Sequence, residues 1–372
     1  MRWIRVAAVV AAFAAVIGMA KDTLAGKPGG TSPPPATGTI YFQDLSTLDA
    51  TNNTYTYGSM DGSGGSRAVL LRTSHDARPS RRLHGGTRWF LASVRLDLVG
   101  LSRNDLIAVR EDGAREVRLT NNDGTMAYSN LDWAPDEDGA SATVSMVARR
   151  WTGPTRDDTV VPGTAGLYTA HLTFDGTGDV VGLDADPAYR LSLGIVGDSL
   201  GERADARGYS WSPDMARLVV QSYYGGWDGD PSTPDPQIRV VDATSGAVTP
   251  LGAGDVPDWS PDGSKIAYRR WIDGKFPGFA LQTVRPDGSG VATLLFFKQR
   301  VGATRSQYLY SPKWSPDGAY LAYEYVDAQN GYSWTHYIYR IAADGTGKTN
   351  LTPEVTTGSG GGVFGLALVD WR

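Results

Sequence analysis

The sequence predicts an all-β protein whose repeated units close into a ring. A tryptophan followed by Ser-Pro-Asp occurs three times, at Trp211, Trp259 and Trp314, and each copy leads into a strand-like segment. A glycine turn follows two of these copies, as RPDGSGVATLL from Arg285 and IAADGTGKTNLT from Ile341. The two ends of the repeat region each hold part of one further unit. Such repetition is the signature of a repeat architecture, and we interpret the unit as a four-stranded β-meander.

The residue types of the repeat fit short antiparallel strands. Asp-Gly forms a tight hairpin turn because glycine adopts positive φ without steric cost and aspartate hydrogen-bonds to its own backbone. The proline before this turn cannot donate to a ladder, so the strand ends there. The tryptophan is expected to be buried between one sheet and the next. The I-A-Y or L-A-Y segment that follows predicts a strand covered on both faces.

Weaker copies bring the number of units to six. A degraded phrase begins at Trp133, and another unit keeps only its second strand, at Gly86–Arg95. Ile40–Gln43 corresponds to the I-A-Y strand of the repeat, but the strand that should precede it is missing. Leu366–Arg372 is a single strand with no unit of its own, and Trp371 near its end matches the repeated tryptophan, whose positions we call the tryptophan column. Pairing of these two segments would complete the first unit and remove an exposed sheet edge.

The sequence therefore predicts a six-bladed β-propeller of four-stranded antiparallel blades, closed by the C-terminal strand pairing in the first blade. An open β-solenoid is the alternative, but it would need capping repeats and leaves the truncated first unit unexplained.

The repeat resembles that of a known family. The phrase WSPDG-x-x-[IL]-A-Y, followed by x-x-D-G-[ST]-G, is similar to the TolB-like propeller repeat of bacterial envelope proteins, from about Ile40 to Arg372. The resemblance implies a propeller in a periplasmic setting. TolB carries a separate α/β domain ahead of its propeller and contacts a peptidoglycan-associated lipoprotein, and this chain has no room for that domain.

The N-terminus predicts export. Two arginines within residues 1–5 precede an apolar run and small residues at Gly18 and Ala20, which is the pattern of a secretory signal peptide. The run is too short for a membrane span, and cleavage after Ala20 or Ala25 fits equally well. We assign residues 1–25 to the signal peptide, 26–38 to a Pro/Gly-rich linker, and 39–372 to the propeller. The chain has no cysteine for a lipid anchor, so a periplasmic or secreted protein is expected.

Composition narrows the function classes. The formal net charge of -5 is spread along the chain, and one basic cluster near Arg78 and Arg88 is more typical of a solvated face than of nucleic-acid binding. Four histidines and no cysteine give little material for a metal site, so neither metal nor cofactor is expected. The segment Ala342–Thr349 imitates a phosphate-binding loop, but it aligns with the repeat's hairpin turn, which makes Lys348 a surface residue.

Two other segments imitate functional sites. Gly62–Gly65 (GSGG) imitates the surroundings of a serine nucleophile, but it is a repeat turn. Asp228, Asp230 and Asp235 lack the spacing of a calcium loop, and a polar turn is the better interpretation.

Long connections between the second and third strands predict a ligand-binding rim, because such loops emerge on one side of the ring. The rim is rich in arginine and aromatic residues, which suit sugars, carboxylates or a partner protein. The alternative is that these rings pack the loops onto the blades. The candidate ligand-binding residues are Arg150, Trp151, Tyr223, Tyr224, Trp227, Arg270, Trp271, Tyr332, Trp334 and His336.

Two function classes remain open. The first is a non-catalytic, monomeric binding or scaffold propeller that engages a protein, peptide or envelope polysaccharide through its rim or central funnel. The second is a propeller-type polysaccharide lyase or hydrolase. Convergence of two or more of the four histidines with a carboxylate would favour catalysis, whereas scattered histidines would favour binding.

Overall fold

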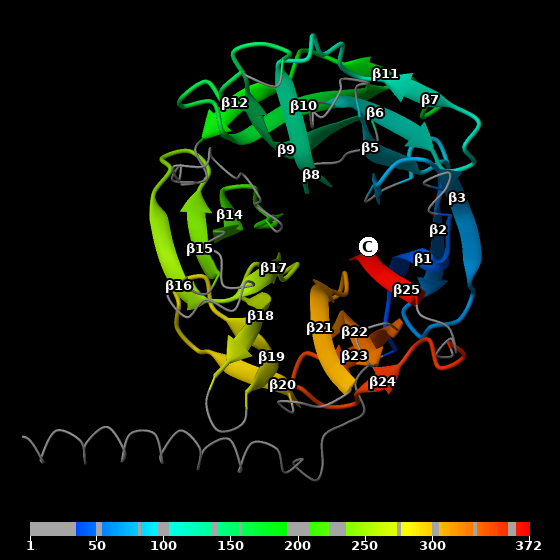
Figure 1. The fold of residues 1–372 in the computed structure, drawn as a ribbon, viewed down its shortest axis with the longest axis vertical. Coiled ribbons are helices and arrows are strands. Elements are labelled where there is room, and N and C mark those ends of the chain that lie inside the picture. The colour runs from blue at the N-terminus through cyan, green and yellow to red at the C-terminus, as the bar shows by residue number, and fades with distance from the viewer. Residues whose placement is uncertain are drawn as a thin grey trace, which may run out of the picture. The chain divides into compact units, whose positions relative to one another are not determined.

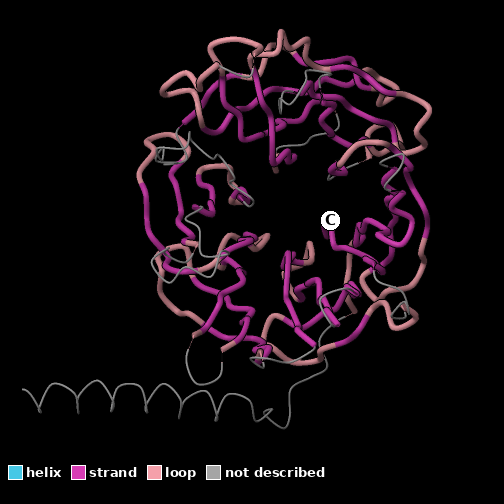
Figure 2. Tube along the Cα trace, in the orientation of Figure 1, coloured by secondary structure: helices cyan, strands magenta, loops and turns pink. Residues whose placement is uncertain are grey.

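The computed structural model describes residues 35–49, 54–80, 83–95, 104–135, 140–155, 158–191, 209–222, 236–273, 277–299, 305–329, 333–355 and 362–372. The predicted signal peptide and most of the linker lie outside these residues. The described residues form strands and turns and contain no helix. Within residues 35–372, the sheets stand around a common centre in a propeller-like arrangement (Figures 1 and 2).

Two sheets come from the first half of the chain, and their strands pair antiparallel. The first contains β4 (Ala77–Pro79), β5 (Trp89–Arg95), β6 (Asn104–Arg110) and β7 (Glu116–Arg118). The second contains β8 (Met126–Trp133), β9 (Ser141–Arg150), β10 (Gly166–Phe174) and β11 (Val180–Leu183), and β12 (Ala188–Leu191) also pairs with β10.

Two more four-stranded antiparallel sheets follow, and both contain the tryptophan repeat. The third sheet contains β13 (Tyr209–Trp211), β14 (Arg217–Ser222), β15 (Gln237–Asp242) and β16 (Val248–Ala253). The fourth contains β17 (Asp255–Trp259), β18 (Ile266–Ile272), β19 (Gly278–Val284) and β20 (Ala292–Lys298).

The fifth sheet has eight strands and joins the two ends of the repeat region. Its late strands are β21 (Arg305–Trp314), β22 (Tyr320–Gln329), β23 (Ser333–Ala342), β24 (Thr349–Asn350) and β25 (Gly362–Trp371). Its early strands are β1 (Thr39–Asp49), β2 (Thr54–Asp61) and β3 (Ala68–Thr73).

The predicted pairing of the two chain ends is confirmed. Strand β25 lies antiparallel beside β1, with Ile40 opposite Trp371 (Figure 1). The amide of Thr39 donates to the carbonyl of Arg372 at 2.6 Å, and the amide of Arg372 donates to the carbonyl of Thr39 at 2.9 Å. The first half of β25 also pairs parallel with β23, which was not predicted. Because of this parallel ladder, the expected first and last sheets are one continuous sheet.

The tryptophan column is buried as predicted, because each ring fills the space between neighbouring sheets. Trp133 is fully buried, and Trp211, Trp259, Trp314 and Trp371 are at most 6% exposed. Several of these indoles also donate a hydrogen bond to the preceding sheet, as Trp133 does to the Arg78 carbonyl at 3.0 Å. The column therefore supplies both apolar contact and hydrogen bonds between sheets.

The Asp-Gly segments form the predicted turns. Asp61 accepts hydrogen bonds from the amides of Ser63 and Gly65 at 2.8 and 3.0 Å, and the Ser63 hydroxyl also donates to it. These donors favour the charged carboxylate and lower its pKa to about 2. Equivalent turn hydrogen bonds lower the pKa of Asp175, Asp287 and Asp344.

These turns predict a loss of stability in acid. A carboxylate whose folded pKa lies below its unfolded value stabilises the fold above about pH 4, and this contribution is lost as the pH falls toward about 2. The melting temperature is therefore expected to fall over this range, as measured by circular dichroism. A variant with Asp61, Asp175, Asp287 and Asp344 changed to Asn should show a shallower fall, and equal slopes in the two proteins would contradict the assignment.

Candidate functional site

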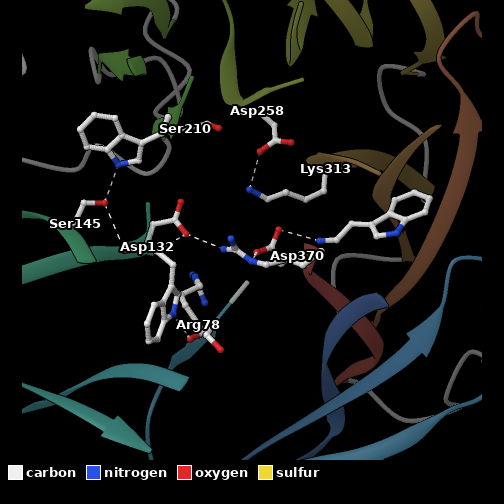
Figure 3. Close-up of polar contacts among 12 residues, drawn as sticks. Arg78, Asp132, Ser145, Ser210, Asp258, Lys313 and Asp370 are labelled. Atoms are coloured by element: carbon white, nitrogen blue, oxygen red, sulfur yellow. Dashed lines mark hydrogen bonds and ion pairs between the residues drawn. The ribbon is translucent and has the colours of Figure 1, made fainter. Parts of the chain in front are cut away.

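The innermost strands carry a polar side chain at one equivalent position. These residues occupy the position just before the tryptophan column. Strand β4 has no tryptophan at this place, so its backbone hydrogen bonds give the alignment. The amide of Ser80 donates to the carbonyl of Trp89, as the amide of Ser260 donates to that of Lys265. Arg78 therefore corresponds to Asp258. We call this set the collar, and Figure 3 shows its members converging on the centre: Arg78, Asp132, Ser210, Asp258, Lys313 and Asp370.

The collar surrounds a cavity of about 330 Å³, which we call the central cavity. Arg78, Asp132, Lys313 and Asp370 line it, together with Arg372. Strands β1, β8, β13, β17, β21 and β25 all contribute lining residues. The volume lies at the lower end of the range of small-ligand pockets.

Positive and negative groups alternate in the central cavity and pair with one another. The Arg372 guanidinium lies 2.9 Å from the Asp132 carboxylate and also pairs with Asp370. The Lys313 ammonium lies 3.1 Å from the Asp258 carboxylate. Burial alone would lower the pKa of Lys313, but the carboxylates of Asp258, Asp370 and Asp132 outweigh burial and raise it. Three acidic side chains, Asp76, Asp132 and Asp370, and three basic ones, Arg78, Lys313 and Arg372, line the cavity, so it has a strong local field but a balanced charge.

Three strained β-bulges adjoin the collar. Asn130, Val256 and Ser311 have φ of 49°, 44° and 45°, and each lies two positions before a collar residue. The strand registers shift at the same places. Positive φ is a real outlier for a β-branched residue such as Val256, and bulges with such strain cluster at functional sites. All three residues line the central cavity, so the bulges shape its wall.

The predicted rim residues Arg150 and Trp151 lie together at the end of β9. Trp151 forms an isolated bridge with Val160, and the Arg149 guanidinium lies 5.4 Å above its ring. Trp151 is half-buried and Arg150 is exposed. This local packing agrees with the alternative interpretation, in which the ring fixes its own loop.

A second group of predicted residues lies in a row of aromatic rings. Trp271 packs edge-on to Phe279 at 4.7 Å, Phe279 lies 5.7 Å from Tyr308, and Tyr308 stacks on Trp334 at 5.5 Å. We call these four residues the aromatic row, and Arg270 beside it is exposed.

The connections next to Trp271, Trp334 and His336 are shorter than predicted. Strands β18, β22 and β23 extend to Ile272, Gln329 and Ser333, so all three residues lie on strands. The ladders continue because these segments are rich in aromatic and β-branched residues. The predicted residues Tyr223, Tyr224, Trp227 and Tyr332 lie outside the described residues.

The four histidines do not converge. His75 is 3.3 Å from Glu116, His84 stacks on Phe174 at 3.6 Å, and His171 is 3.1 Å from the Thr143 hydroxyl. His336 pairs with Glu324 on the neighbouring strand. Among the described residues, no group of three or more metal-binding side chains comes together, and no helix is long and apolar enough to cross a membrane.

Sequence reasoning missed the collar, although a signal for it is present. The residue before each tryptophan is Asp132, Ser210, Asp258, Lys313 or Asp370, so this column is polar in every copy. A polar residue at a fixed place beside a buried tryptophan indicates a position that faces away from the apolar core.

Comparisons with known proteins show the fold. No protein-family model and no curated protein matches this chain. Among solved structures, TolB from Acinetobacter baumannii is 16% identical over 91% of this chain and 69% of that chain, with a TM-score of 0.51. A protein assigned as TolB from Agrobacterium tumefaciens is 18% identical over 88% of this chain and 92% of that chain, with a TM-score of 0.44. The likeness to the first of these structures supports a TolB-like propeller fold.

Proposed function

We propose that this protein is an exported, non-catalytic binding propeller that holds an extended segment of an envelope protein, peptide or polysaccharide in its central cavity and on the surrounding rim. We infer six blades within the five sheets, by dividing the eight-stranded sheet into two four-strand runs, β21 to β24 and β25 with β1 to β3. Export rests on the sequence of residues 1–25.

The central cavity is the observation that carries the proposal. Its wall combines charged side chains from opposite sides of the ring with three strained bulges. A strained backbone conformation persists only when the surrounding structure holds it in place. Such conformations are typical of ligand clamps. A pocket with convergent polar groups is the default binding site of a protein.

The charge balance of the cavity indicates what it binds. Electrostatic complementarity selects partners of matching potential, and a wall with equal numbers of acidic and basic groups matches a segment that carries both charges or none. A polyanionic polysaccharide would meet the three wall carboxylates as well as the three wall cations, so its charge matches the wall less well than that of a mixed-charge segment. The dispersed histidines likewise favour binding over the alternative lyase or hydrolase activity.

An array of extended synthetic peptides with mixed, acidic, basic or no charge tests this function. The intact chain is expected to retain mixed-charge peptides best, and Asp132→Asn should weaken their binding about tenfold, in line with loss of a charged contact. Asn keeps the oxygen that accepts the Trp133 amide at 2.8 Å, and the melting temperature of the variant checks that its fold is retained.

The matched control is Asp287→Asn in an exposed turn, which should bind like the unchanged protein. Equal binding by all three proteins would reject the cavity as the site. Cleavage of oligogalacturonate by the intact chain would favour the enzymatic alternative instead.

A further inference from the structure

A second group of aromatic rings lies away from the central cavity and holds a cation. The Lys348 ammonium lies 4.9 Å from the ring centre of Phe297, 5.0 Å from that of Tyr339 and 6.0 Å from that of Tyr325. These rings come from β20, β23 and β22. We call Phe297, Tyr325 and Tyr339 the aromatic cage.

The rings stand at the angles that enclose a cation. Tyr325 and Tyr339 are 5.4 Å apart with an interplanar angle of 70°, and Phe297 lies 5.4 Å from Tyr325 at 39°. The ring faces carry negative potential, so rings that face a common point attract positive charge there. The cage thus forms three walls around the position of the Lys348 ammonium.

The ammonium is not the best-matched cation for this cage. Within the described part of the chain, Lys348 makes no ion pair or hydrogen bond, and ring faces are its only partners. The neighbouring rings partly desolvate the Lys348 ammonium, and this lowers its pKa because no carboxylate compensates. An ammonium has three N–H donors that an aromatic face satisfies poorly. A quaternary ammonium has none and is less costly to desolvate.

A fully buried tyrosine packs against the aromatic cage. Tyr323 is fully buried, stacks on Tyr339 at 5.7 Å and lies 6.3 Å from Phe297. Its hydroxyl has no hydrogen-bond partner among the described residues. Tyr323 thus supports two of the cage rings by packing against them.

Lys348 is able to leave the cage. It follows Gly347, which has a φ of 64°, and precedes the two-residue strand β24. Lys348 is itself exposed, so its side chain can turn into solvent. We propose that the aromatic cage is a binding site for a quaternary ammonium group and that Lys348 is its displaceable internal occupant. This site is separate from the central cavity, so the proposal is independent of the function proposed above.

Choline is the probe that tests this site, with 3,3-dimethylbutanol as its neutral analogue. Equilibrium dialysis of the full chain is expected to show choline binding that is about tenfold tighter in Lys348→Ala than in the unchanged protein, because the internal competitor is removed. The neutral analogue should bind at least about tenfold more weakly, since it lacks the charge that the rings attract. Adding Tyr339→Leu to Lys348→Ala should abolish binding.

Vesicles distinguish the source of the ligand. Co-sedimentation of the unchanged protein with phosphatidylcholine vesicles, but not with phosphatidylglycerol vesicles, would assign the group to a lipid headgroup. Saturable choline binding without sedimentation would assign it to a free ligand. Equal binding of choline and its neutral analogue, or no choline binding by a Lys348→Ala protein that melts like the unchanged one, would overturn the proposal and leave Lys348 as a structural contact.

Discussion

Deletion of residues 366–372 is expected to remove most of the free energy of unfolding. The deletion breaks the ladder between β25 and β1 and removes Leu366, Leu368 and Trp371 from a buried cluster that includes Ile40 and Phe42. Trp371→Ala alone is expected to cost about 3–5 kcal/mol. A whole domain has only about 5–15 kcal/mol to lose, so the truncated chain should show little cooperative unfolding.

Urea denaturation followed by tryptophan fluorescence measures this effect. Trp271→Ala serves as the matched control, because this ring is half-buried. It donates to the exposed Asp273 carboxylate and packs edge-on to Phe279, an aromatic contact worth about 0.5–1.5 kcal/mol. A truncated protein whose midpoint equals that of the full chain would show that the pairing of the ends does not stabilise the ring.

Arg269→Met is expected to cost about 3–5 kcal/mol, because it leaves a buried carboxylate without its partner. Arg269 is only 4% exposed, and its Nε donates to the Asp255 carboxylate at 2.7 Å. The same guanidinium donates to the Leu309 carbonyl at 2.8 Å and stacks on Tyr310, so it joins β18 to β21.

The neighbouring residue provides a close control for this substitution. Arg270 is exposed, and Arg270→Met should change the free energy of unfolding by less than about 0.5 kcal/mol. A double variant, Arg269→Met with Asp255→Leu, should recover part of the loss, because it removes the orphaned charge as well. Equal costs for the two arginine substitutions would contradict the assigned role of Arg269.

The repeat pattern predicted the parts of this fold that depend on local chemistry. Asp-Gly turns, the buried tryptophan column and the pairing of Ile40–Gln43 with the last strand all follow from residue types with few alternative conformations. The parallel ladder between β23 and β25 was not predictable in this way, because a residue pattern along a strand indicates which side chains are buried and not which strand lies alongside.

The sites were less predictable than the fold. The prediction that Lys348 lies on the surface agrees with its exposure, but the sequence does not show that three rings from different strands surround its ammonium. The collar was missed for a similar reason. Its residues come together only when the ring closes, as Asp132 and Arg372 do across the cavity. Such contacts between distant segments depend on tertiary geometry.

The pairing of β1 with β25 has a consequence for biosynthesis. The indole of Trp371 donates to the carbonyl of Thr37, and these residues are 334 positions apart in the chain. The ribosome makes β1 before β25. One edge of β1 therefore lacks its strand partner, and the hydrogen bonds of that ladder, during nearly the whole of translation. An unpaired edge of this kind is a template for aggregation, and it stays exposed until β25 is available to pair with β1.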